Sequence, residues 1–415
     1  MKKNVLLLLV VVVGLSVVLV YTKYQHVSFA SRILSNSDTS NVLEKNTPVS
    51  VLSLEKNNSL FLKSTSIETT EEIKNQTPKQ IGHPIRGIYV SAPVMNSPKA
   101  RQRILEMLES TTINAVVIDI KDSSGYVFLP EQSATPSTYS FNRTPYTTNA
   151  QEFIQTLKQK NIYLIARIVV FQDPVMTVYK PEFALKNKAG FVWKDKKGMA
   201  FLDPQNRSVW DYTRDLSLET IQFGFDEINF DYIRYPSDGL ISQIAYNIPD
   251  ELRRRDMIEN FMKYLHDELR VKNNVIISAD IFGDTVRLEG DPGIGQTFEQ
   301  ALPYFDAVAP MTYPSHFASG SYGIENPDMF PREVMQGVAA DMTRRLQVWC
   351  ENYTSQDKET VCTSFKNRPW IQDFSLHNTY GVNEVKAQID ALEQAGITSW
   401  LVWNPASRYT TSAFK

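Results

Sequence analysis

The most informative stretch of the chain runs Gly-Phe-Asp-Glu-Ile-Asn-Phe-Asp-Tyr-Ile-Arg-Tyr-Pro, residues 224–236. Successive side chains of a strand point to opposite faces, and one face of this stretch then carries Phe225, Glu227, Asn229 and Asp231. Buried carboxylates are costly unless they are paired or hydrogen-bonded, so this face does not belong to an ordinary apolar core. The lumen of a parallel barrel accommodates such a face and places its last polar residue at the catalytic mouth. The stretch therefore predicts a barrel strand with Asp231 at the mouth and Arg234 following within reach of an anionic site. The alternative is an ion-pair network with a purely structural role.

The same organisation continues on both sides of this stretch. From Pro84 onwards, short apolar runs alternate with polar loops and amphipathic stretches, a pattern typical of βα units and a parallel sheet. We expect eight strands, at Arg86–Ser91, Asn114–Ile120, Tyr163–Phe171, Glu227–Ile233, Val275–Ile281, Ala307–Tyr313, Trp370–Phe374 and Ser399–Trp403. Helical periodicity predicts helices at Ser97–Glu109, Gln151–Lys160, Val209–Ile221, Glu251–Leu269, Arg332–Gln347 and Val382–Gln394.

Eight βα units over about 330 residues are the size of a (β/α)8 barrel, or TIM barrel, with inserted loops. An open doubly wound sheet is the alternative, but no glycine-rich phosphate loop follows the first strand. The third unit carries a long insertion, Gln172–Pro204, and long βα loops of this kind often wall a substrate cleft. The chain stops soon after Trp403, so we expect the eighth helix to be missing or very short.

Composition limits the classes of partner and cofactor. The chain has 415 residues, 42% of them hydrophobic, and a formal net charge of -3 without a long basic block. This balance argues against a nucleic-acid partner held by phosphate contacts. With only 5 histidines and 2 cysteines, a Cys/His zinc site is not expected, and the sequence predicts no metal and no cofactor. Cys350 and Cys362 form either a local disulfide, if the domain is exported, or a pair of free thiols.

The N-terminal region reads as an export element followed by a tether. Lys2 and Lys3 precede an almost unbroken apolar run, Val5–Val20, which is typical of a signal peptide or a signal anchor. We favour an uncleaved membrane anchor at residues 1–23 with its lysines in the cytoplasm. Residues 24–80 are rich in Ser, Thr, Asn, Lys and Glu and are predicted to be a disordered linker. The barrel domain, residues 81–415, is then extracytoplasmic, and it is secreted if the segment is cleaved.

Active sites of such barrels use residues at the carboxyl ends of the strands. The strand ends here are acidic and aromatic, without a Ser/His/Asp triad or a metal cluster. We expect Asp231 and Asp280 to be catalytic, and Arg167 to pair with Glu227 or to share its polar network in the lumen. The candidate substrate-binding residues are Tyr89, Asp119, Asp122, Arg167, Glu227, Asn229, Arg234, Tyr313, His316, Gln372, Asp373 and Trp403.

This set of residue types fits sugar chemistry. Aromatic rings stack on the apolar faces of pyranose rings, while carboxylates and amides bind hydroxyl groups. Cleavage of a glycosidic bond needs two carboxyl groups, one protonated and the other ionised or nucleophilic. Asp231 and Asp280 end adjacent predicted strands, so their separation could suit a retaining mechanism.

Five runs of the chain resemble one bacterial family. They are residues 86–91, 117–122, 230–236, 278–283 and 310–316, and the resemblance spans about Ile85 to Pro405. The family comprises uncharacterised TIM-barrel glycoside hydrolases related to the α-amylase-like glycosidases. In the amylase-like groups, an Asp that ends the fourth strand is the nucleophile, and Asp231 occupies that place. Those groups usually take a Glu on the fifth strand as the acid, whereas this chain has Asp280, a departure that bears on the acid assignment.

The sequence therefore predicts a glycoside hydrolase that cleaves an envelope or extracellular polysaccharide or oligosaccharide with paired carboxylates. The alternative is a non-catalytic glycan-binding barrel tethered to the cell surface. A carbohydrate or peptidoglycan deacetylase is disfavoured because that chemistry needs Asp/His metal ligands.

Overall fold

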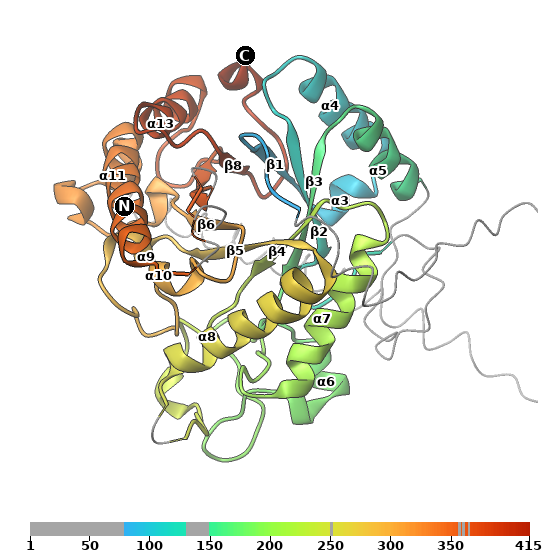
Figure 1. Cartoon of the computed structure of the whole chain (residues 1–415), viewed down its shortest axis with the longest axis vertical. Helices are drawn as coiled ribbons and strands as arrows, with labels where there is room; N and C mark the ends of the chain where they lie inside the picture. The colour runs from blue at the N-terminus through green and yellow to red at the C-terminus, as the bar shows by residue number, and fades with distance from the viewer. Residues whose placement is uncertain (1–78, 130–148, 250–251, 356–357, 359–361, 364–365) are drawn as a thin grey trace, which may run out of the picture. The chain divides into compact units, whose positions relative to one another are not determined.

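The computed structural model describes residues 79–129, 149–249, 252–355, 358, 362–363 and 366–415. All of them belong to one compact unit of the chain. Eight parallel strands form a closed barrel in chain order, with β8 paired to β1 (Figure 1). The strands are β1 (Arg86–Val90), β2 (Ala115–Lys121), β3 (Tyr163–Val169), β4 (Glu227–Asp231), β5 (Ile276–Phe282), β6 (Ala307–Met311), β7 (Trp370–Gln372) and β8 (Trp400–Trp403). The prediction of a TIM barrel is confirmed.

Helices cover the outside of the barrel and alternate with the strands (Figure 1). They are α4 (Pro98–Glu109), α5 (Ala150–Gln159), α7 (Arg207–Ile221), α8 (Arg254–Leu265), α10 (Phe298–Ala301), α11 (Pro331–Asn352) and α13 (Val382–Gln394). Shorter helical pieces are α3 (Ala92–Met95), α6 (Met176–Tyr179), α9 (Asp284–Arg287), a π-helical turn η4 (His266–Val271), and the 3₁₀ turns η2 (Pro181–Phe183), η3 (Ile241–Gln243), η5 (Pro314–His316), η6 (Ser321–Gly323) and η7 (Pro327–Met329). As expected, only a 3₁₀ turn, η9 (Thr411–Phe414), follows β8.

Local sequence explains where the elements begin and end. Helix α4 begins at Pro98, where proline needs no hydrogen-bond partner, and the Ser97 hydroxyl caps it by accepting from the N–H of Ala100. Strand β4 ends at Asp231 rather than at the predicted Ile233 because Tyr232 adopts a left-handed backbone conformation with a φ of 54°. This turn leaves the Asp231 side chain at the very end of the strand.

The alternation of side chains divides the barrel into two cores. Outward-facing residues such as Ile88, Ile118 and Ile228 pack beneath the helices in the larger core. Inward-facing residues form a second, smaller cluster in the lumen, which includes Val117 and Ile165. Phe225, which precedes β4, packs in the larger core and not on the lumen face that its sequence spacing predicts.

The lower lumen holds a buried ion pair that the sequence did not reveal. Glu227, the first residue of β4, pairs with Arg368, and both side chains are fully buried. The Glu227 carboxylate also accepts hydrogen bonds from Ser278 and, at 3.0 Å, from the Tyr163 hydroxyl. Glu227 does not pair with Arg167, but the two share a polar network, as the alternative form of the prediction has it. Ser278 hydrogen-bonds to Glu227 and to Asn229, and Asn229 donates to Asp280, which lies beside Arg167. In the β3–β4 register Arg167 lies opposite Asn229, one inward-facing layer closer to the mouth.

The insertion after β3 contains the short helix α6, the 3₁₀ turn η2 and several isolated β-bridges, one of them to Ile244 in the loop after β4. Lys121 anchors it through an ion pair with Asp173 at 2.9 Å, and both side chains are almost completely buried. Trp193 is buried as well, and its indole N–H donates to the Leu240 carbonyl at 3.1 Å. None of its residues lines the cavity described below, so the expected cleft wall is not found here.

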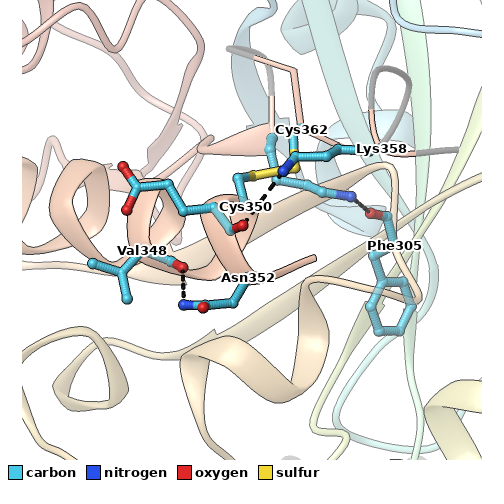
Figure 2. The surroundings of a disulfide bond; sticks show 8 residues. Phe305, Val348, Cys350, Asn352, Lys358 and Cys362 are labelled. Atoms are coloured by element: carbon cyan, nitrogen blue, oxygen red, sulfur yellow. Dashed lines mark hydrogen bonds between the residues drawn. A yellow bond between two sulfur atoms is a disulfide. The ribbon is translucent and has the colours of Figure 1, made fainter. Parts of the chain in front are cut away.

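A disulfide joins Cys350, in the last turn of α11, to Cys362 (Figure 2). Of the two alternatives for these cysteines, the structure has the local disulfide. Within the part of the chain that the structure describes, no helix is long and apolar enough to cross a membrane. The predicted anchor, residues 1–23, and nearly all of the predicted linker, residues 24–80, lie outside the described residues.

Candidate active site

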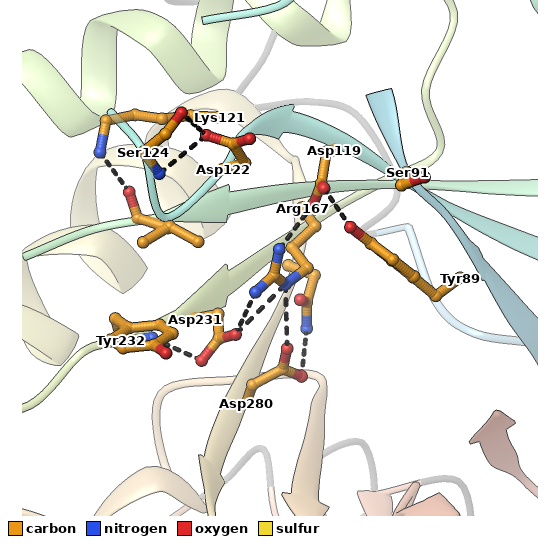
Figure 3. Close-up of polar contacts among 12 residues, drawn as sticks. Tyr89, Ser91, Asp119, Lys121, Asp122, Ser124, Arg167, Asp231, Tyr232 and Asp280 are labelled. Atoms are coloured by element: carbon orange, nitrogen blue, oxygen red, sulfur yellow. Dashed lines mark hydrogen bonds and ion pairs between the residues drawn. The ribbon is translucent and has the colours of Figure 1, made fainter. Parts of the chain in front are cut away.

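Four ionisable side chains meet near the carboxyl ends of four successive strands. Asp119 comes from β2, Arg167 from β3, Asp231 from β4 and Asp280 from β5, and all four are buried (Figure 3). They belong to strands that are hydrogen-bonded neighbours in the barrel, so the fold itself brings them together. The predicted catalytic pair is therefore placed in one polar cluster with Arg167 at its centre.

Arg167 links the carboxyl groups of this cluster. Its Nη1 lies 2.6 Å from Oδ1 of Asp119, and its Nη2 lies 2.6 Å from Oδ2 of Asp231. Its Nε donates to the same Asp231 oxygen at 3.2 Å and lies 3.9 Å from Oδ2 of Asp280. Burial alone would lower the pKa of Arg167, but the charges of Asp119 and Asp231 outweigh it, and the pKa lies well above its ordinary value. Arg167 is thus a fixed positive charge between the carboxyl groups.

Asp280 lies in surroundings that favour its protonated form. Burial, and then the negative charge of Asp231, raise the pKa of Asp280 to about 8. Its Oδ1 accepts hydrogen bonds from Nδ2 of Asn229 at 2.9 Å and from the indole N–H of Trp370 at 2.7 Å. No hydrogen bond from the described residues engages Oδ2, which leaves this oxygen to carry the proton.

Asp231 is held in a different way. Its Oδ2 accepts two hydrogen bonds from Arg167, and its Oδ1 accepts the backbone N–H of Tyr232 at 2.6 Å. The left-handed turn at Tyr232 is what brings that N–H back onto the carboxylate. The two carboxyl groups therefore differ in their hydrogen-bond donors: Asp231 accepts from the Arg167 cation, whereas Asp280 accepts from the neutral donors Asn229 and Trp370 and lies 3.9 Å from Arg167.

Both carboxyl groups open into one cavity of about 290 Å³ at the mouth of the barrel. This volume is near the lower bound of ligand pockets, which are roughly 300–1,000 Å³. The cavity is lined by Arg167, Asp231, Tyr232, Arg234, Asp280, Phe282, Gly283, Asp284, Met311, Tyr313, His316, Phe317, Trp370 and Trp403. A Cβ on Gly283 would lie 2.3 Å from the Met311 carbonyl oxygen, so only glycine permits this close approach of the β5 end to β6.

Aromatic residues form a wall beside the acids at the mouth of the barrel. Trp403 stacks on Tyr89 with ring centroids 4.1 Å apart and meets Trp370 edge-on at 5.6 Å. The Tyr89 hydroxyl donates to Asp119 and so connects this wall to the polar cluster. Tyr313 completes the wall from the end of β6. A wall of this kind offers flat apolar surface to a sugar ring next to the carboxyl groups.

The predicted residues fall into three groups. Asp231, Asp280, Arg167, Arg234, Tyr313, His316 and Trp403 line the cavity. Tyr89, Asp119 and Asn229 support it from behind through the hydrogen bonds given above. Glu227, Asp122, Gln372 and Asp373 have other partners and do not line it.

The last group serves the fold. Asp122 caps a turn by accepting the N–H of Ser124 at 2.9 Å. Gln372 accepts the N–H of Ser315 at 3.1 Å and thereby holds the loop that carries His316. Asp373 accepts two hydrogen bonds from Thr410, both at 2.7 Å, and burial raises its pKa to about 6.

Sequence reasoning missed Trp370 and Arg368. Trp370 faces the same way as Gln372 two residues later, so strict alternation along the seventh strand would have placed its indole in the lumen. Arg368 precedes β7, outside the predicted strand, and gave no periodic signal. Among the described residues, no cluster of His, Cys, Asp or Glu is arranged to hold a metal ion.

A closed parallel barrel with two differently held carboxyl groups at its mouth defines the class of TIM-barrel glycosidases. Residues 87–409 match the model of one such family, described as "Putative glycosyl hydrolase domain" (DUF4015). Because the match covers most of the chain, the chain belongs to this family and is a hydrolase of glycosidic bonds.

Several solved structures are also similar to the chain, either at low sequence identity or over less than half of its length. α-L-Fucosidase isoenzyme 2 from Paenibacillus thiaminolyticus has a TM-score of 0.50 at 10% identity, over 80% of this chain and 48% of the fucosidase. A hypothetical protein from Ruminiclostridium thermocellum ATCC 27405 is 32% identical over 46% of this chain and 96% of its own, with a TM-score of 0.42. An α-galactosidase from Thermus thermophilus has a TM-score of 0.48 at 11% identity, over 81% of this chain and 66% of its own. The fucosidase supports the barrel fold alone. A comparison with curated proteins finds no match.

Proposed function

We propose that the chain is a retaining glycoside hydrolase of envelope or extracellular polysaccharide, with Asp231 as nucleophile and Asp280 as general acid and base. One observation carries the proposal: both carboxyl groups open into the same cavity, where burial and the charge of Asp231 raise the pKa of Asp280 to about 8, while Arg167 holds Asp231 through two hydrogen bonds. A glycosidase needs this division between one acid and one ionised carboxylate.

The positions on the strands favour retention. The β4–β5 register pairs Phe230 with Ala279, so Asp231, the last residue of β4, comes beside Asp280, which lies two residues before the end of β5. Neighbouring strands lie about 4.8 Å apart. Carboxyl groups of retaining enzymes are about 5–5.5 Å apart, whereas inverting enzymes need roughly 6.5–9.5 Å to admit a water molecule.

The proposed reaction has two steps. Asp280 transfers its proton to the glycosidic oxygen as that oxygen leaves, and the Asp231 carboxylate attacks the anomeric carbon to form a glycosyl ester. Asp280, now ionised, then takes a proton from water, and the resulting attack breaks the ester and restores both groups. Arg167 positions Asp231, Asn229 and Trp370 position Asp280, and Trp403 and Tyr313 hold the sugar ring.

The test is hydrolysis of a broad oligosaccharide panel by the full chain and its variants. Asp231→Asn is expected to abolish turnover while folding and glycan binding persist. Asp280→Asn is expected to slow natural leaving groups by about 10²–10⁴-fold but to slow activated aryl glycosides far less, because only the former need strong protonation. The matched control, Asp122→Asn, changes a carboxylate outside the cavity and should leave turnover intact. Full turnover by Asp231→Asn contradicts the assignment of Asp231 as the nucleophile. The anomer of the sugar product that NMR detects first decides between retention and inversion.

We also propose that the barrel is extracytoplasmic and is tethered to the membrane by residues 1–23. The lysine-flanked apolar run and the disulfide support this, since disulfides persist in oxidising compartments. Protease added to intact cells should release the barrel by cutting within residues 31–80. Complete protection of the chain, with a surface protein cleaved in the same sample, contradicts this topology.

A further inference from the structure

Arg234 lies in the cavity wall and is rigidly held. Its residue is buried, and its Nη1 donates to the Tyr235 carbonyl at 3.1 Å and to the Ser237 hydroxyl at 3.2 Å. Its guanidinium carbon lies 4.8 Å from the ring centroid of Tyr232 and 5.5 Å from that of Phe282. One hydrogen bond to a backbone carbonyl, one to a side-chain hydroxyl and two aromatic rings thus fix the orientation of the guanidinium.

The other charges of this cavity are balanced within the protein. Arg167 is balanced by Asp119 and Asp231, and Asp284 pairs with Arg287 at 3.0 Å. Asp280 is largely neutral near pH 7 because of its raised pKa. Arg234, in contrast, makes no ion pair with any carboxylate of the described residues.

An unpaired buried cation is costly to the folded protein. Burial lowers the pKa of Arg234, and the favourable influences of Tyr232, Asp231 and Asp238 do not offset this. Proteins keep such a charge where a ligand supplies the counter-charge. The cost of burying Arg234 is then offset when an anionic ligand binds beside it.

The other donor groups of the guanidinium fit one kind of anion best. Nη1 of Arg234 donates to the Tyr235 carbonyl and the Ser237 hydroxyl, and the guanidinium also hydrogen-bonds to the Tyr232 side chain. No carbonyl or carboxylate of the described residues accepts from Nε or Nη2. These two groups form the side-on edge of the guanidinium, whose parallel N–H bonds match the two oxygens of a carboxylate.

We propose that the glycan cleaved by this enzyme carries a carboxylate on the sugar that occupies the cavity, and that Arg234 binds this carboxylate through Nε and Nη2. The inference rests on the proposed function and adds the substrate class: an acidic, not a neutral, polysaccharide. The carboxylate is either the ring carboxyl group of a hexuronic acid or that of an acidic substituent such as a lactyl ether or pyruvyl ketal.

The test uses matched pairs of oligosaccharides, each acidic glycan beside its carboxyl-reduced counterpart. Hexuronate-containing and substituent-carrying glycans form two arms, which distinguish the sources of the carboxylate, and sulfated glycans form a third. Binding to the full chain is measured by calorimetry, and hydrolysis is measured as kcat/KM on the same pairs. Arg234→Gln and Arg234→Lys are compared with wild type, and Arg332→Gln removes a surface arginine as the matched control.

We expect the affinity and kcat/KM of the wild type to be roughly 10–100-fold higher for one acidic glycan than for its reduced partner. This factor corresponds to the usual contribution of a charge-assisted bidentate contact. Arg234→Gln should reduce binding and hydrolysis of the acidic glycan far more than of its reduced partner, so that the preference disappears, and Arg234→Lys should restore only part of the preference. Binding that favours the acidic glycan and depends on Arg234 supports the inference, even if no glycan is cleaved. A failure to cleave any glycan would instead contradict the proposed catalysis. Equal use of both members of every pair, an equal loss on both in Arg234→Gln, or a preference for sulfated glycans alone overturns it.

Discussion

At the scale of single residues, Asp280 determines how the enzyme should respond to pH. Its pKa of about 8 comes from burial and from the charge of Asp231, so the acid form is present at neutral pH. We predict that kcat/KM on substrates with poor leaving groups falls as pH rises through about 8, measured as a pH–rate profile. In Asp280→Asn this alkaline limb should disappear, whereas the control Asp341→Asn, on the distant helix α11, should keep it. An unchanged alkaline limb in Asp280→Asn would assign the acid to another residue.

The same shift has a consequence for folding. The folded-state pKa of Asp280 lies above its ordinary value of 3.8, so between these values the folded chain holds a proton that the unfolded chain has lost. The contribution of Asp280 to stability is therefore complete at low pH and is lost as pH rises towards about 8. Asn at this position has no proton to lose, and its Oδ1 can still accept from Asn229 and Trp370. Denaturant titrations should show Asp280→Asn gaining stability relative to wild type as pH rises.

Arg167 supplies a second prediction at this scale. Replacing it with Met leaves Asp119 and Asp231 buried without their counter-charge. We predict a loss of roughly 3–5 kcal/mol in the free energy of unfolding at neutral pH. The loss should shrink in acid, where the carboxylates can take up protons, and Arg167→Lys should lose less than Arg167→Met. An unchanged melting temperature of Arg167→Met would show that this cluster does not contribute to stability.

At the scale of elements, the ion pair between Glu227 and Arg368 connects the start of β4 to the segment before β7. Arg368→Met leaves a fully buried carboxylate with only two neutral donors, so we predict a destabilisation of about 3–5 kcal/mol. The double variant Arg368→Met/Glu227→Gln should recover much of this loss because it removes the charge that was left. Arg86→Met breaks a half-exposed pair with Glu393 and should cost less than about 1 kcal/mol. A double variant as unstable as Arg368→Met would show that packing, not charge, decides the effect.

The elements also show what sequence alone can predict. Alternation along residues 224–236 was enough to place Asp231 at the mouth, and repetition of the βα pattern was enough to predict eight strands. Neither pattern could assign the ion-pair partners of side chains in the lumen, because these pairs depend on the register between strands that are far apart in the chain. The ion pair between Glu227 and Arg368 was therefore not predicted. Asp122 and Asp373 were misplaced for a related reason: each lies one residue beyond a strand, where the backbone turns and alternation stops.

At the scale of the whole molecule, the C-terminal segment takes the place of the eighth helix. The Tyr409 hydroxyl donates to the Tyr89 carbonyl on β1, and Thr410 binds Asp373 after β7. Thr112, which precedes β2, donates twice to the Phe414 carbonyl, at 2.9 Å each. The segment thus connects the first and last units of the barrel around the point where β8 pairs with β1.

This arrangement predicts that the barrel closure depends on Phe414, which is 2% exposed and packs against Trp400. Phe414→Ala should lower the free energy of unfolding by about 3–5 kcal/mol, because it leaves a cavity at a well-packed site. Lys415→Ala, at the exposed neighbouring position, should stay within about 0.5 kcal/mol of wild type. Hydrogen exchange should accelerate first in β1 and β8, the two strands that close the barrel. If Phe414→Ala instead accelerates exchange evenly around all eight strands, the segment adds to general stability and does not act as the closure of the barrel.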